Sequence, residues 1–192
     1  MAQNVLVCYF DVESEAYQAI TELKSYENTE KSIIAEAALV RKENNTLKVL
    51  DGLDTGARTG NDAAVGGLVG AIFGILGGPI GILLGGSLGV LIGAAFDGSD
   101  ASEDASILER IAQKMDDNDL AIIALTDEED ESILDEKLSK FQVIIARFDA
   151  AVVAAEVEKA RIMEKELARQ AREDLRNEKK AARKQKAEEK KA

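Results

Sequence analysis

Few side chains in this sequence are of the types that perform chemistry, and their spacing assembles no catalytic set. The sequence contains no histidine, which removes the commonest general base and the commonest metal ligand together. Cys8 is the single cysteine, so no intramolecular disulfide can form, and a serine or cysteine nucleophile lacks its usual histidine partner. We therefore expect no enzymatic activity, no catalytic residues and no cofactor.

Two patterns look like ligand sites, and each has a simpler interpretation. The acidic run 127–131 invites a metal-binding hypothesis, but carboxylates at the start of a helix are ordinarily solvated and favoured by the helix dipole. The glycine repeats contain GxxxG, but the Gly-Lys-Ser/Thr ending of a phosphate-binding loop is absent. We expect neither a metal site nor an identifiable small-molecule substrate.

Charge is distributed unevenly along the 192 residues. The formal net charge is −12, from 24 basic and 36 acidic residues, but residues 156–192 hold 13 basic and 9 acidic ones. That tail carries +4, which leaves 11 basic and 27 acidic residues, a net charge of −16, in the remainder. An acidic body argues against nucleic acid as the main partner, because its phosphates would be repelled.

Residues 63–96 are the stretch that the rest of the chain must accommodate. This stretch has no charged residue and holds eleven of the fifteen glycines. On a helix, glycines spaced four residues apart form a stripe along one face, and such a stripe lets another backbone approach closely. We predict helix-packing roles for two runs with this spacing, one at Gly66, Gly70, Gly74 and Gly78, and the other at Gly77, Gly81, Gly85, Gly89 and Gly93.

The stretch is predicted to fold as a tight helical hairpin with legs 63–76 and 80–96. The turn is assigned to Gly77, Gly78 and Pro79, a triplet that favours a break in a helix. Each leg would be about 21–26 Å long, a little short for a span that takes about 20 residues. Between the glycines lie residues expected to face lipid or a core: Leu68, Val69, Ile72, Phe73, Leu76, Ile80, Leu83, Leu84, Leu88, Leu91 and Ile92.

The remaining sequence alternates between strand and helix patterns. Apolar runs predict strands at 4–10, 33–41, 46–50, 120–125 and 142–148, with a turn at Asn44-Asn45. Helical spacing predicts a helix over 12–25 capped by Asp11, another after a capping box at Asp100 and Glu103, and a third through Ile133 and Leu138. From residue 150 there is neither Gly nor Pro, which predicts one long charged helix.

These elements predict an α+β fold in three parts. Residues 1–55 and 99–150 would form a ferredoxin-like βαββαβ sheet, extended at its edge by the last strand. Residues 56–98 would be the inserted glycine-zipper hairpin, and 151–192 the charged C-terminal helix. Because both ends of the insert join one sheet, the insert must leave and re-enter the domain on the same side of any bilayer.

The order VLVCYFDVESEAYQAITEL, IIAEAALVRKENNTLKVL, the glycine block with its central Gly-Pro, and LAIIAL resembles a bacterial family of uncharacterised small membrane proteins. In that family a ferredoxin-like domain carries an inserted glycine-zipper segment. The resemblance covers roughly residues 4–150 and implies membrane association, with no established activity. The long charged C-terminal helix departs from the family pattern.

Two functional hypotheses follow. The first is a non-enzymatic membrane-associated protein that self-assembles through the glycine stripes, with its α/β domain and basic tail on the cytoplasmic side. Its partners would be the lipid bilayer and other copies of the chain. The alternative is a soluble cytoplasmic homo-oligomer whose hairpins bury one another in a shared apolar core, as a structural or stress-related assembly.

Overall fold

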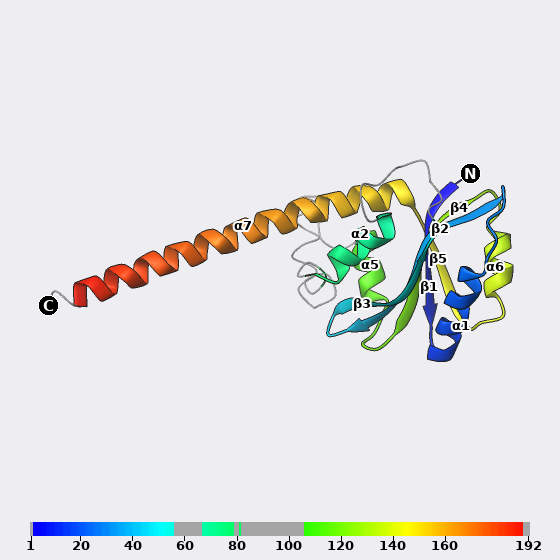
Figure 1. Ribbon diagram of the computed structural model, residues 1–192, viewed down its shortest axis with the longest axis horizontal. Coiled ribbons are helices and arrows are strands. Elements are labelled where there is room, and N and C mark those ends of the chain that lie inside the picture. The colour runs from blue at the N-terminus through cyan, green and yellow to red at the C-terminus, as the bar shows by residue number, and fades with distance from the viewer. Residues whose placement is uncertain (1, 56–66, 79–80, 82–105, 190–192) are drawn as a thin grey trace.

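The computed structural model describes residues 2–55, 67–78, 81 and 106–189 (Figure 1). Five strands form one antiparallel sheet in the order β3-β2-β4-β1-β5, as part of an α+β fold. The strands are β1 (Ala2–Phe10), β2 (Ser32–Glu43), β3 (Thr46–Asp54), β4 (Leu120–Glu128) and β5 (Val143–Asp149). The helices in the described part are α1 (Glu13–Lys24), α2 (Gly67–Leu76), α5 (Ile107–Gln113), α6 (Ser132–Leu138) and α7 (Ala150–Glu189).

Helices cover both faces of the sheet (Figure 1). α1 and α6 pack on one face, around residues such as Leu6 and Cys8 of β1. α2, α5 and the beginning of α7 pack on the other face, around Val5 and Val7 of the same strand. Because successive side chains of a strand point to opposite faces, a strand that is apolar at every position can supply both cores.

The predicted ferredoxin-like strand order is wrong. In that order the third strand of the unit lies beside the first, whereas here β3 pairs only with β2, and β4 lies between β1 and β2. β4 is buried at nearly every position, while β3 exposes half of its side chains, including Val49, which is 53% exposed. A strand that is apolar on both faces buries the most apolar surface in the middle of a sheet, whereas a half-polar strand is better accommodated at an edge, where its polar side chains stay in water.

Two local predictions about turns and caps have opposite outcomes. The turn at Asn44-Asn45 is confirmed, with φ of 52° and 60°, the left-handed pair that a two-residue hairpin turn requires. The prediction that Asp11 caps the first helix is wrong. Val12 is the N-cap of α1 and makes no side-chain cap bond, because the helix begins one residue later, where the Glu15 N–H donates to the Val12 carbonyl.

The long C-terminal helix is confirmed as α7, a single helix of 40 residues. Its first part is held on the sheet by the buried side chains of Ala150, Val153, Val157 and Ala160. Beyond this anchor the helix projects far past the rest of the domain (Figure 1). The fifth strand β5 lies at the sheet edge beside β1, as expected for an extension of the unit.

Candidate functional site

The described part of the uncharged stretch is α2, whose large side chains face the core of the chain itself. Ile72 and Leu76 are at most 1% exposed and pack in the same cluster as residues of β1, β2 and β4. Leu68 and Val69 are also buried there, and Phe73 is half-buried. The rest of the predicted lipid- or core-facing set lies outside the described residues: Ile80, Leu83, Leu84, Leu88, Leu91 and Ile92.

The predicted stripe glycines that the structure describes divide into two groups. Gly70 and Gly74 are exposed on α2, and a Cβ built on either would meet no heavy atom of the described residues within 4 Å. A Cβ on Gly77 would lie 2.9 Å from the Leu47 carbonyl oxygen, so the absence of a side chain lets the end of α2 approach β3. Gly78 and Gly81 have similarly crowded Cβ positions. The remaining stripe and turn residues, Gly66, Gly85, Gly89, Gly93 and Pro79, lie outside the described residues.

A glutamate from the sheet holds the beginning of α2. The register of β2 against β4 shifts between Ile34 and Glu36. This bulge lets Glu36 turn toward α2, on the side where Ala35 is also buried. The backbone N–H groups of Leu68, Val69 and Gly70 donate to the Glu36 carboxylate. These are amides of the first helical turn, which have no partner within the helix, so Glu36 acts as a long-range N-terminal cap.

Gly67 makes this cap possible. Its φ is +62°, and a Cβ built there would lie 1.9 Å from one Glu36 carboxylate oxygen and 2.0 Å from the other. Burial raises the pKa of Glu36, and the nearby Asp54 carboxylate acts in the same direction, while the α2 amides lower it. The raised pKa means that the amide bonds do not fully compensate for taking the charge out of water.

The start of α5, which follows the insert in the sequence, is held in a similar way. The backbone N–H groups of Ile107 and Leu108, at the start of α5, donate to the two carboxylate oxygens of Glu156 on α7, at 3.0 and 3.1 Å. The Ser106 hydroxyl accepts from the Glu109 N–H at 3.2 Å as the N-cap. Two glutamates that are distant in sequence therefore cap the first helix described within the uncharged stretch, α2, and the first helix described after it, α5.

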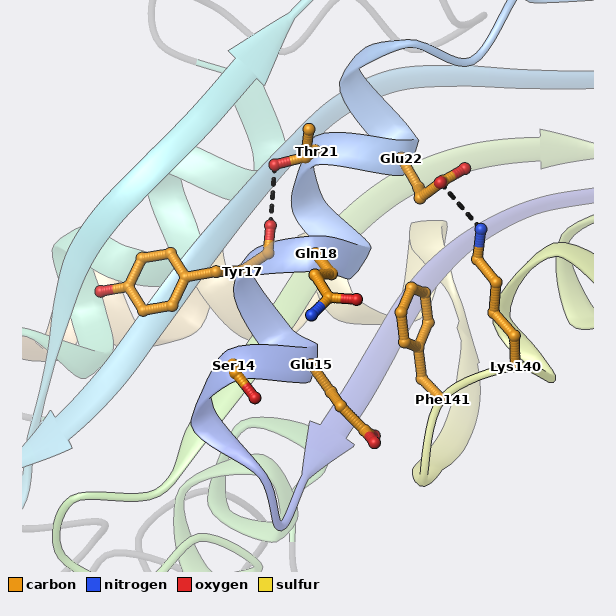
Figure 2. Close-up of a pocket in the computed structure, with 8 residues that line it drawn as sticks. All are labelled: Ser14, Glu15, Tyr17, Gln18, Thr21, Glu22, Lys140 and Phe141. Atoms are coloured by element: carbon orange, nitrogen blue, oxygen red, sulfur yellow. Dashed lines mark hydrogen bonds and ion pairs between the residues drawn. The ribbon is translucent and has the colours of Figure 1, made fainter.

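A separate cavity of about 620 Å³ lies beside α1 (Figure 2). It is lined by the outer face of α1 and by Lys140 and Phe141, which follow α6. Its charged groups already have partners, since Lys140 Nζ lies 2.8 Å from Glu22 Oε1 and the Gln142 N–H donates to Glu15 Oε2 at 2.6 Å. These contacts bind α1 to the loop before β5 and pair the charged groups of the cavity with one another or with the backbone.

Sequence reasoning missed a buried ion pair inside the predicted acidic run. Glu128, at the end of β4, has a fully buried side chain, and Arg147 of β5 donates to both of its carboxylate oxygens at 3.1 Å. Arg147 also donates to Asp135 of α6 at 2.8 Å. The available signal was an arginine within an apolar strand, which requires a carboxylate nearby. Among the described residues, no group of three or more potential ligands could hold a metal ion.

In the part of the chain that the structure describes, no helix is both long enough and apolar enough to cross a membrane. No protein-family model, curated protein or solved structure matches this chain. The resemblance to small glycine-zipper membrane proteins therefore stays a prediction, and the geometry around α2 has to carry the functional inference.

Proposed function

We propose that this chain is a non-enzymatic, membrane-associated protein that self-assembles through the glycine face of its uncharged stretch. One observation carries the proposal: α2 turns its large side chains toward the sheet and leaves Gly70 and Gly74 exposed, with open space at both Cβ positions among the described residues. Because glycine has no side chain, two such faces can bring their helix backbones into direct contact. The partner that best fits this face is a second copy of the same helix.

The docking of α2 limits how the stretch can enter a bilayer. β3 and β4 belong to one sheet, so the segment between them must start and end on the same side of the membrane. With α2 and Gly77 held against the sheet, the uncharged residues left for lipid are 79–96, and a single crossing takes about 20 residues. Two crossings do not fit. Residues 79–96 would therefore enter the bilayer and return, with the α/β domain and basic tail on the cytoplasmic side.

Membrane fractionation with alkaline carbonate tests this insertion. The comparison is between the full chain and a variant lacking residues 80–96, which keeps α2 and every side chain of the core that the structure describes. We expect the full chain to resist carbonate extraction and to require detergent, and the shortened chain to be released. A full chain that carbonate extracts, or a shortened chain that stays in the membrane, would count against the proposal.

A second candidate function is favoured by a different feature of the same helix. The apolar face of α2 is already buried by its own chain. The apolar surface that remains to be covered by lipid or by another protein is therefore smaller than the 34-residue uncharged stretch would expose if all of it left the domain. A soluble, cytoplasmic homo-oligomer could bury residues 79–96 between copies, as a structural or stress-related assembly. A detergent-free, monodisperse particle of several subunits would support this candidate over the first.

A further inference from the structure

The projecting half of α7 carries a row of basic residues with the period of the helix. Arg161, Lys165, Arg169, Arg172, Arg176 and Lys179 follow one another at steps of three or four residues. At 3.6 residues per turn these six positions fall within an arc of about 80°. Among them, the residues from Lys165 onward are exposed. We call these six residues the basic stripe. In the sequence the same spacing continues at Arg183 and Lys186.

The stripe is available to a partner because most of it lies beyond the anchored part of α7. Among the side chains described in α7, the last fully buried one is Ala160 and the last one packed against the core is Met163, so only Arg161 of the stripe lies within the anchored part. From there the helix extends past the domain (Figure 1). The acidic residues of this part of the helix lie beside the stripe or opposite it, with Glu173 about 40° from its edge and Glu164 and Glu166 about 60° from it. The stripe is therefore a continuous positive line on a chain whose body carries −16.

We propose that the basic stripe is a docking surface for a bilayer that contains anionic lipids. A straight row of charge about 27 Å long, all on one face, matches an extended flat surface of lipid phosphates. A DNA duplex presents a curved surface whose major groove is about 12 Å wide, so a straight helix lying across it would bring only some of these charges near phosphates. The inference goes beyond the proposed function, since it uses none of residues 63–96.

Vesicle sedimentation of the full chain tests the stripe. Vesicles of neutral phosphatidylcholine are compared with vesicles that also contain phosphatidylglycerol, for the wild type and for Arg169→Gln, Arg172→Gln and Arg176→Gln combined. Glutamine keeps a high helix propensity, which circular dichroism verifies. Each basic residue near an anionic surface contributes about fivefold to affinity, so we expect the triple variant to lose about 100-fold on phosphatidylglycerol vesicles. About 1 M salt should remove most of the extra binding of the wild type to phosphatidylglycerol vesicles over neutral ones, because the Debye length falls to about 3 Å.

The control removes the same number of charges elsewhere, as Lys31→Gln, Lys48→Gln and Lys159→Gln combined, all exposed and outside the stripe. It should bind nearly as the wild type does. The assignment would be overturned if the two triple variants lost equal affinity for the vesicles. It would also be overturned if wild-type affinity did not depend on phosphatidylglycerol, or if the wild type bound a DNA duplex more tightly than these vesicles. Repeating the series in the chain lacking residues 80–96 separates the two proposals, because neutral-vesicle binding reports insertion and phosphatidylglycerol-dependent binding reports the stripe.

Discussion

Replacing Gly67 by alanine should undock α2 from the sheet. The new methyl group would lie 1.9 Å from a Glu36 carboxylate oxygen, and the residue would have to keep a φ of +62°. The left-handed conformation costs a non-glycine residue about 1–2 kcal/mol. Displacing the carboxylate also removes the cap on the Leu68, Val69 and Gly70 amides, which costs about 0.5–2 kcal/mol. We expect a total loss of about 1.5–4 kcal/mol, concentrated at α2.

Gly70→Ala is the matched control for this substitution. It makes the same chemical change three residues away, at an exposed helical position where the added methyl group meets nothing described within 4 Å. Alanine favours a helix over glycine by about 1 kcal/mol, so this variant should be as stable as the wild type or slightly more so. Denaturant unfolding gives the total change, and hydrogen exchange shows whether the α2 amides lose protection before those of β4. Equal stability and equal α2 protection in the two variants would refute the capping role of Glu36.

Three further predictions concern groups that the fold buries. Folding raises the pKa of Glu36, so the stabilisation that this group contributes is full below the ordinary glutamate pKa and is lost as pH rises through the folded pKa. Glu36→Gln keeps a capping oxygen but does not titrate. Denaturant unfolding at a series of pH values should therefore show the stability of the variant rising relative to that of the wild type above about pH 4.5. Burial raises the pKa of Cys8 from 9.0 to about 12, so folded protein should react with a thiol reagent far more slowly than unfolded protein at pH 8, and stability should fall as pH rises from 9 to 12. Arg147→Met should cost about 3–5 kcal/mol in urea titrations by leaving Glu128 buried and unpaired, whereas adding Glu128→Gln should recover a large part of the loss.

The elements of this fold could be read from the sequence more reliably than their arrangement. Periodicity located all five strands and the long C-terminal helix, since each depends on residues near one another in the chain. The strand order depends instead on which strand buries the most apolar surface when it lies between two neighbouring strands. The contrast between LAIIALTDE in β4 and TLKVLDGLD in β3 contains that information, whereas the succession of elements alone favours the order of a ferredoxin-like unit.

In the candidate site, too, the local element could be predicted from the sequence but its packing could not. The glycine spacing predicted a helix with one glycine face, but it could not show that α2 would dock on its own sheet. That docking depends on Glu36, which a strand bulge turns toward α2, and on a positive φ at Gly67. Neither a bulge nor a long-range cap leaves a regular spacing in the sequence. The Glu128–Arg147 pair was missed for the same reason, because its two members come from different strands.

The most direct test of self-assembly through the glycine face is the mass of the particle in mild detergent. Light scattering would compare the wild type with a Gly70→Leu and Gly74→Leu double variant, because a Cβ at either position meets no heavy atom of the described residues within 4 Å. The proposal predicts several subunits for the wild type and a clearly smaller particle for the variant, with unchanged secondary structure. A monomeric wild type, or a variant of the same mass as the wild type, would contradict it.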